Sequence, residues 1–299
     1  MTAQPSHYRG RFAPSPTGPL HLGSLLAALV SYLEARRQGG EWWVRIEDLD
    51  PPRTQPGASD AILRSLEAHG LVWDSSVMHQ SQRDDAYQNA IEVLADRDKL
   101  FWCRCSRKQL AGHAVYPGTC RACRQPRADA AIRFQAPDID DDFIDLFQGP
   151  QRTALASDYG DVVIRRRDGL FAYQLAVVVD DADQGMTDIV RGIDLLSSTF
   201  WQRALYRALG HECPSHAHFP VLVHAGQKLS KQNFAPALNN NQATANLMQL
   251  WPWLGLDVQA DTPERMLAEA LGQWSPTYLH GLGEISLETK PDNFNPDKK

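Results

Sequence analysis

A Pro- and Gly-rich segment near the N-terminus has the residue types of a phosphate-binding turn. It reads RFAPSPTGPLHLGS from Arg11 and places His21 and Gly23 where the turn leads into a helical pattern. Backbone N–H groups and the helix dipole favour an anion at such a helix start, and glycine lets a nucleotide approach the backbone. Histidine can donate a hydrogen bond to a phosphate. The segment indicates a nucleotide site, although an ordinary loop with an exposed histidine has the same short pattern.

A second segment, KLSK over Lys228–Lys231, follows about two hundred residues later. Two ammonium groups at this spacing could clamp a triphosphate and stabilise the charge that builds up on a departing pyrophosphate. Alone, such a string is more typical of a solvated surface loop. Its occurrence together with the first segment favours a site that binds ATP.

Four of the five cysteines fall within one short window, Cys103, Cys105, Cys120 and Cys123, while Cys213 stands alone. This clustering, in a chain without the features of a signal peptide, favours a metal over disulfides. Paired thiols at both ends of a loop are typical of a zinc site. The residue types alone would make all four cysteines ligands; reduced cysteines in an inserted loop are the alternative.

The hydrophobic pattern predicts a βαβ unit around the first segment. Residues 10–50 indicate a strand, a tight loop, a helix that ends at a glycine pair, and a second strand that ends in acidic residues. This is the start of a doubly wound α/β domain. An α+β domain with a chance Gly-rich turn is the alternative.

Further elements follow from the same patterns. Helices are predicted over 59–70, 83–98 and 197–210, the last capped by Ser197 or Ser198 and stopped by Gly210. Residues 161–183 predict a hairpin with its turn near Asp168-Gly169. A strand and a polar loop follow over 218–231, then two short helical patterns over 247–254 and 262–274.

Composition excludes some classes of protein. The chain has 299 residues, 43% of them hydrophobic and 22% charged, as in a globular protein with a core. A net charge of -6 argues against a uniformly basic surface, although a local run such as Arg165–Arg167 could contact RNA phosphates. The acidic string over 138–142 predicts a solvated loop. Without an apolar run of membrane-spanning length, we expect a cytoplasmic protein with no membrane association.

Taken together, the two segments resemble the signature motifs of class I aminoacyl-tRNA synthetases, specifically the glutamyl branch. VRIEDLDPPR and FAYQLAVVVDDADQGMTDIVRGIDLL are also similar to that branch, so the resemblance runs from about Arg9 to Leu238. It implies a Rossmann-like doubly wound catalytic domain in residues 1–99 and 170–238. It also implies a zinc-binding, acceptor-type insertion over 100–169 and a short helical C-terminal region over 239–299.

The resemblance assigns roles residue by residue. Six residues match the pocket for L-glutamate: Arg11, Ala13, Ser15, Glu47, Tyr173 and Arg191. In that pocket an acidic residue, Glu47, suits the α-ammonium group of the substrate, and a planar guanidinium suits its side-chain carboxylate. Four residues match the ATP site, with Mg²⁺ expected to accompany the nucleotide: His21, Gly23, Lys228 and Lys231. His21 and Lys231 are the expected catalytic pair, and Gln232 departs from the usual serine.

The resemblance also changes the expected metal ligands. In the tRNA-modifying branch of the family a tyrosine replaces one cysteine, which gives Cys103, Cys105, Tyr116 and Cys120 as ligands of one structural Zn²⁺. Cys123 is the rival fourth ligand.

The length of the chain after the second motif separates the branches of the family. Translational relatives carry a helical anticodon-binding region there, and about sixty residues are too few for such a domain. We therefore expect a monomeric ligase of the tRNA-modifying branch, which uses L-glutamate, ATP and tRNA(Asp) carrying queuosine. A minimal enzyme that charges tRNA(Glu), or a non-catalytic RNA-binding relative, is the alternative.

Overall fold

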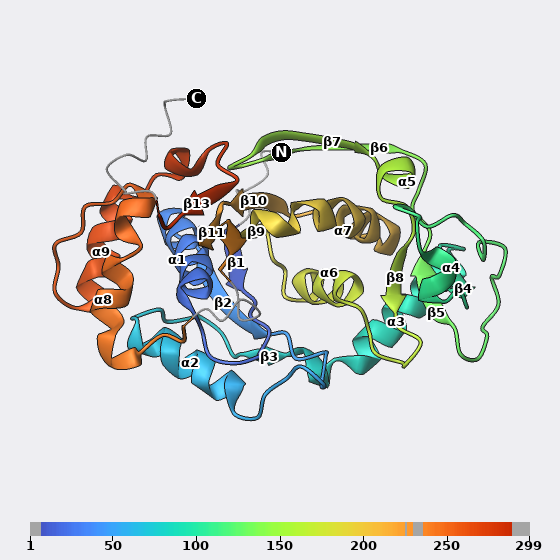
Figure 1. Ribbon diagram of the computed structural model, residues 1–299, viewed down its shortest axis with the longest axis horizontal. Coiled ribbons are helices and arrows are strands. Elements are labelled where there is room, and N and C mark those ends of the chain that lie inside the picture. The colour runs from blue at the N-terminus through green and yellow to red at the C-terminus, as the bar shows by residue number, and fades with distance from the viewer. Residues whose placement is uncertain (1–6, 225, 230–235, 289–299) are drawn as a thin grey trace.

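The computed structural model describes residues 7–224, 226–229 and 236–288, so Ser230, Lys231 and Gln232 lie outside the described residues. Its elements are arranged around a layer of parallel strands (Figure 1). β1 (Arg9–Phe12) pairs with β2 (Glu41–Ile46), and β2 pairs with β3 (Met78–His79). α1 (Leu22–Arg37) and α2 (Ala58–Ala68) connect them. The predicted βαβ unit is confirmed.

The layer continues beyond β1. β9 (Asp188–Gly192) pairs in parallel with β10 (Ser215–Phe219), and the backbone N–H of Thr187 donates to the carbonyl of Arg9 at 3.0 Å. The order is therefore β3-β2-β1-β9-β10. α1 lies against one side of this layer, and α6 (Tyr173–Asp183) and α7 (Leu196–Leu209) lie toward the other (Figure 1). This is the expected doubly wound α/β architecture.

The predicted hairpin over 161–183 is wrong in its second half. The first run forms β8 (Val162–Arg165), and Gly169 has the positive φ of a tight turn. The second run forms α6, whose residues Leu175–Asp181 are all buried. A helix buried on every side lacks an amphipathic period, and its three consecutive valines imitate a strand.

α7 matches its prediction except at its start. Gly210 ends the helix with φ 85°, but the flanking residue at the other end is Leu195, at the close of the 3-10 turn η2 (Ile193–Leu195). The capping role predicted for Ser197 or Ser198 is therefore wrong, because both serines lie inside the first turn.

The segment after β3 leads to a separate antiparallel sheet. η1 (Gln80–Gln82) and α3 (Asp84–Asp96) precede β4 (Leu100–Cys103), which pairs with β5 (Ala131–Phe134), and β5 pairs with β8. α4 (Arg107–Leu110) lies in the loop between β4 and β5. The cysteine window thus sits at the end of this sheet.

The acidic string is not the predicted solvated loop. It opens β6 (Asp140–Asp145), which forms a long hairpin with β7 (Gly149–Ala154) and also pairs with β10; α5 (Leu155–Asp158) follows. Asp141 is 2% exposed and accepts hydrogen bonds from Arg203 and Arg207 on α7. Alternation along β6 turns this aspartate inward, which the composition of the string does not reveal.

The part of the chain that follows β10 packs on α1. Within its described residues the elements are β11 (Val221–His224), β12 (Gln227–Lys228), η4 (Asn240–Gln242), α8 (Ala243–Met248), η5 (Trp251–Leu254), α9 (Pro263–Gln273), η6 (Pro276–Leu279) and β13 (Glu284–Ser286). The indole N–H of Trp274 donates to Glu34 on α1 at 3.0 Å.

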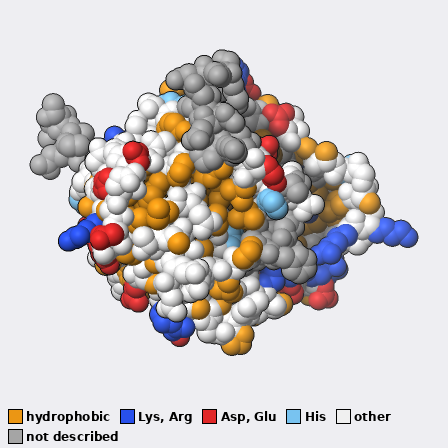
Figure 2. All heavy atoms as spheres, turned by 60° about the vertical axis from the view of Figure 1, so that its left-hand side comes forward, with side chains coloured by type: hydrophobic (Ala, Val, Ile, Leu, Met, Phe, Trp, Pro, Cys, Tyr) orange, Lys and Arg blue, Asp and Glu red, His pale blue; other side chains and the backbone are white. Residues whose placement is uncertain are grey.

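In Figure 2 hydrophobic side chains gather at the centre of the face that comes forward, and charged ones of both signs surround them. Among the described residues, no helix has the length and apolarity needed to cross a bilayer.

Two glycines near helix ends allow a matched stability test. Gly210→Ala should lower the free energy of unfolding by about 1–2 kcal/mol, because an L-residue is strained at its left-handed φ. Gly272→Ala, in exposed and open surroundings within α9, should raise it by up to about 1 kcal/mol. Chemical denaturation of both variants measures the difference; equal effects would contradict the structural assignment.

Candidate active site

A cavity of about 790 Å³ lies at the carboxyl ends of the parallel strands, where ligands bind in sheets of this kind. Its walls come from the ends of β1, β2 and β9 and the starts of α1 and α6. The nine predicted substrate-binding residues that the structure describes all line it: Arg11, Ala13, Ser15, His21, Gly23, Glu47, Tyr173, Arg191 and Lys228. The tenth, Lys231, lies outside the described residues.

The start of α1 forms one end of the cavity. His21 is the N-terminal flanking residue of this helix, and its Nδ1 accepts from the N–H of Ser24 at 3.3 Å. In the neutral ring the proton then lies on Nε2, which leaves this nitrogen as the donor. A Cβ atom on Gly23 would lie 3.1 Å from the His21 ring and 3.3 Å from the carbonyl of Leu229. Glycine therefore permits the close approach of the loop that carries Lys228.

Lys228 reaches the same cavity from the other motif. Its ammonium group forms an ion pair with Asp194 at 2.5 Å, at the start of η2. The described part of the second motif, Lys228 and Leu229, thus lies at the same cavity as the first motif, about two hundred residues away in the sequence.

Arg11 is held by the buried carboxylate of Asp181 on α6. Its Nε and Nη2 donate to the two oxygens of Asp181 at 2.9 and 3.0 Å, and Nη1 of Arg45 donates to the same carboxylate at 2.7 Å. Burial raises the pKa of Asp181, but the two guanidinium groups outweigh it and hold the pKa below its ordinary value.

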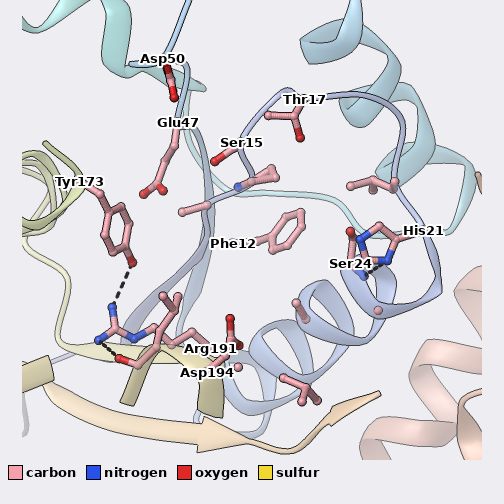
Figure 3. A pocket seen from close by; sticks show the side chains of 18 of the residues that line it. Phe12, Ser15, Thr17, His21, Ser24, Glu47, Asp50, Tyr173, Arg191 and Asp194 are labelled. Carbon is pink, nitrogen blue, oxygen red and sulfur yellow. Dashed lines mark hydrogen bonds between the residues drawn. The ribbon is translucent and has the colours of Figure 1, made fainter. Parts of the chain in front are cut away.

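Glu47 projects into the cavity from the end of β2, opposite Tyr173 (Figure 3). Its carboxylate lies 3.3 Å from Nη2 of Arg45. Burial raises the pKa of Glu47 above its ordinary value, because nearby Arg45 and Arg11 offset only part of the lost hydration. A cation placed beside this carboxylate would be bound favourably.

Arg191 is a buried cation whose hydrogen-bond partners are all neutral. Its Nη1 donates to the hydroxyl of Tyr173 at 3.2 Å, as Figure 3 shows, and Nη2 donates to Thr199 at 2.8 Å. Nη2 also lies 3.4 Å from the carbonyl of Leu195, and Nε donates to His218 at 3.0 Å. Within the described part of the chain, no carboxylate forms an ion pair with it. A buried charge of this kind favours an anionic ligand.

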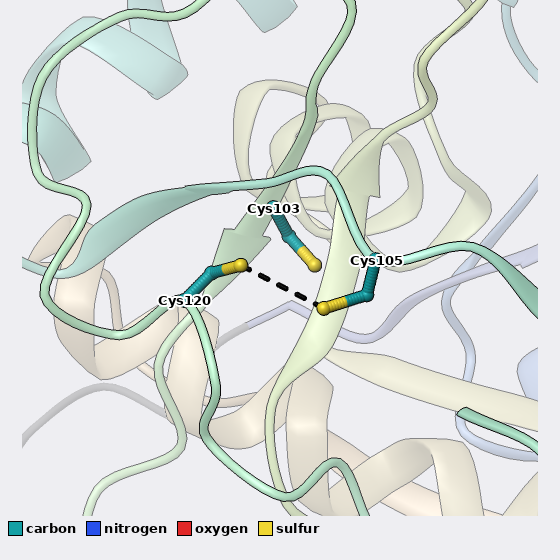
Figure 4. A group of neighbouring side chains, drawn as sticks. All are labelled: Cys103, Cys105 and Cys120. Atoms are coloured by element: carbon teal, nitrogen blue, oxygen red, sulfur yellow. Dashed lines mark hydrogen bonds between the residues drawn. The ribbon is translucent and has the colours of Figure 1, made fainter. Parts of the chain in front are cut away.

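Three cysteines meet at the end of the β4–β5 sheet (Figure 4). The sulfur atoms of Cys103, Cys105 and Cys120 lie within 4.8 Å of one another, and the last two are 3.6 Å apart. Zn–S bonds of about 2.3 Å in a tetrahedral site require sulfur atoms roughly 3.8 Å apart. The donor set therefore fits a metal ion of this kind.

Tyr116 and Cys123, the two candidates for a fourth metal ligand, differ in their position relative to the three cysteines. The Tyr116 hydroxyl is 3.4 Å from the sulfur of Cys103 and 3.6 Å from that of Cys105. Cys123 is outside the group, and its sulfur accepts from Arg127 at 2.9 Å.

Comparison with known proteins agrees with this geometry. Residues 7–247 match the family described as tRNA synthetases class I (E and Q), catalytic domain. A glutamate tRNA ligase from Elizabethkingia meningosepticum, solved with its amino acid, shares the fold with a TM-score of 0.79 and 24% identity. The alignment covers 97% of this chain and 69% of that one. The parallel layer and its cavity are those of a class I synthetase catalytic domain.

More similar relatives define the branch. The glutamyl-Q tRNA(Asp) synthetase of Chromobacterium violaceum is 50% identical over 279 residues, which cover 90% of this chain and 94% of the relative. The protein of that name from Bordetella bronchiseptica is 49% identical over 303 residues, covering 95% and 93%. The chain belongs to the family of glutamyl-Q tRNA(Asp) synthetases, which confirms the branch that its sequence indicated.

The carboxylate of Asp181 can be tested by neutralising it. Asp181→Asn should lower the free energy of unfolding by about 3–5 kcal/mol, because Arg11 and Arg45 would lose their shared buried counter-ion. Asp183→Asn, half-exposed on the same helix, should cost less than about 1 kcal/mol. Denaturant unfolding compares the two, and similar losses would refute the central role of Asp181.

Proposed function

We propose that this chain activates L-glutamate with ATP and transfers the glutamyl group to the queuosine base in the anticodon of tRNA(Asp). The observation that carries the choice of amino acid is Arg191, a buried cation whose hydrogen-bond partners among the described residues are all neutral. The names of its relatives, at about 50% identity over most of both chains, support the choice of acceptor.

The amino-acid pocket suits glutamate at both ends. Burial raises the pKa of Glu47, and an α-ammonium group beside this carboxylate would stabilise its charged form. The side-chain carboxylate of glutamate would accept hydrogen bonds from Arg191 and from the hydroxyl of Tyr173. The oxygen of that hydroxyl accepts a hydrogen bond from Arg191, so its O–H can donate to the substrate. Arg11, Ala13 and Ser15 complete the wall of this pocket.

The nucleotide would occupy the end of the cavity at the start of α1. Gly23 admits it to the backbone, and His21, Lys228 and Lys231 would neutralise its phosphates, with Mg²⁺ as companion ion. The α-carboxylate of glutamate attacks the α-phosphate of ATP, the bond to the β-phosphate breaks, and pyrophosphate leaves. His21 and Lys231 act as the catalytic groups, since they offset the charge that develops in this step.

The transfer step requires no protein nucleophile. A hydroxyl of the cyclopentene ring of queuosine attacks the carbonyl carbon of the adenylate, an ester forms, and AMP departs with the electron pair. The cavity contributes by holding the two substrates in contact, which accelerates such a step strongly.

The cysteine cluster is proposed as a structural zinc site. Cys103, Cys105 and Cys120 would supply three thiolates, and the position of the Tyr116 hydroxyl favours this residue over Cys123 as the fourth ligand. Bound zinc would fix the β4–β5 loop. The proposal includes the division into a catalytic domain (1–99 and 170–238), an insertion (100–169) and a C-terminal region (239–299), a monomeric state and a cytoplasmic location.

The function is tested with ATP, radiolabelled glutamate and two tRNA(Asp) samples, one with queuosine and one with guanosine in its place. Label should reach only the queuosine form, and Arg191→Ala should reduce transfer by at least about a hundredfold because a buried charge pair with the substrate is lost. Labelling of tRNA(Glu) instead would identify a translational enzyme. No label anywhere, with no glutamate-dependent pyrophosphate exchange, would refute catalysis.

The metal site is tested by elemental analysis of purified protein. One zinc per chain is expected, with loss of zinc in Cys120→Ser and retention in Cys123→Ser, because only the first sulfur lies in the cluster. Tyr116→Phe should weaken zinc retention against a chelator. Retention in Tyr116→Phe combined with loss in Cys123→Ser would assign the fourth ligand to Cys123.

A further inference from the structure

Arg191 is attached to the rest of the fold through a chain of buried polar groups. Its Nε donates to Nε2 of His218 on β10 at 3.0 Å, and Nδ1 of His218 lies 2.5 Å from a carboxylate oxygen of Asp145 at the end of β6. The side chains of His218 and Asp145 are both 0% exposed. The arginine that faces the substrate is therefore tied to the β6–β7 hairpin.

The protonation state of His218 follows from its partners. Every N–H of a guanidinium is a donor, so Nε2 of His218 must accept and cannot carry a proton. The proton of the neutral ring lies on Nδ1 and is donated to Asp145. Burial lowers the pKa of His218, an effect that Asp145 offsets only partly, and this agrees with a neutral ring.

Asp145 is fixed independently of the histidine ring. One of its carboxylate oxygens accepts three backbone N–H groups, those of Phe147, Gln148 and His218, each at 3.0 Å. Its charge is thus stabilised by the backbone, and its other oxygen has a set direction. The ring of His218 cannot flip without breaking its hydrogen bonds to Arg191 and Asp145 and its contact with the Thr199 hydroxyl, which lies 3.1 Å from Nε2.

We infer that Asp145 and His218 form a positioning pair that selects glutamate by holding Arg191 through a neutral acceptor. His218 fixes the guanidinium so that Nη1 faces the cavity beside the Tyr173 hydroxyl. Because this acceptor is an imidazole and not a carboxylate, the positive charge of Arg191 is left for the substrate. An acidic residue in the same place would pair with Arg191 and remove the preference for an anionic side chain.

The inference rests on the proposed glutamate activation and is tested by glutamate-dependent ATP–pyrophosphate exchange. In His218→Asn the shorter amide can still donate to Asp145, but it places no acceptor at the position of Nε2, where Arg191 donates. In His218→Gln the longer amide can place an acceptor oxygen there. The KM for glutamate should rise at least about tenfold in His218→Asn and stay within about threefold in His218→Gln. The KM for ATP should change less than about twofold in both, a split that general destabilisation would not produce.

His216 supplies the matched control. It lies two residues earlier on β10, is 3% exposed, and stacks parallel to His218 with ring centroids 6.1 Å apart. It is not among the hydrogen-bond partners of Arg191 in the described structure, and it does not line the cavity. His216→Asn removes a buried imidazole of the same strand and should leave the KM for glutamate unchanged. If it raised this KM as much as His218→Asn does, the positioning role would be refuted.

A charge substitution tests the selectivity. His218→Glu should lower the ratio of kcat/KM for glutamate over glutamine by at least about tenfold, because Arg191 would gain an internal counter-ion. An unchanged ratio would overturn the inference.

If the variants do not fold, the tautomer of His218 in the wild-type protein tests the inference. Nitrogen-15 NMR of histidine-labelled protein should assign to His218 a proton on Nδ1 alone at neutral pH. A proton on Nε2, or on both nitrogens, would overturn the inference. Absence of any glutamate-dependent exchange in the wild type would instead refute the proposed function, so the two failures are distinguishable.

Discussion

The buried carboxylate of Asp181 is the contact on which the catalytic layer depends. It joins Arg11 of β1 and Arg45 of β2 to α6, so one side chain ties the first two strands to the helix that covers them. Three charged groups far from water are tolerable only if each is paired and hydrogen-bonded. The contact anchors the C-terminal part of α6, the helix whose first residue, Tyr173, faces the cavity, and it holds Arg45 near the end of β2, where Glu47 follows. The positions of Tyr173 and Glu47 at the cavity therefore depend on a buried ion pair at the base of the cavity wall.

The cavity combines two kinds of cation with different roles. Arg11 is neutralised by Asp181 and acts as part of the wall, whereas Arg191 is held by neutral groups and retains its charge. Both are arginines at the ends of parallel strands, and composition does not separate them. They differ in the group that accepts their hydrogen bonds, which is the carboxylate of Asp181 for Arg11 and the imidazole of His218 for Arg191. The selectivity of such a pocket for an anionic side chain thus depends on the residues that contact the lining arginines from behind, and not only on the lining residues.

Local pattern and motif spacing sufficed for the βαβ unit and the cysteine window, and the resemblance to the glutamyl branch of the synthetases supplied the predicted residues that line the cavity. They failed where tertiary packing overrides local signals. Valines in the middle of α6 imitate a strand because the helix is buried on all sides. Asp141, read as solvated, faces two arginines of α7. The pairing of Arg11 with Asp181 and of Asp145 with His218 joins residues far apart in the chain, and no local pattern marks such partners. The Lys231 prediction stays a prediction.

The distance along the chain between Arg11 and Asp181, 170 residues, has a consequence for biosynthesis. At about 5–20 residues per second, the ribosome needs roughly 10 to 30 seconds to add the helix that carries the carboxylate. The N-terminal βαβ unit must therefore persist through that interval with two arginines awaiting their counter-ion. Its early strands can pair with each other, but β9 cannot yet cover the exposed edge of β1. Until α6 and β9 emerge, the edge of β1 and the two arginines lack their native partners, and an uncovered strand edge of this kind favours aggregation.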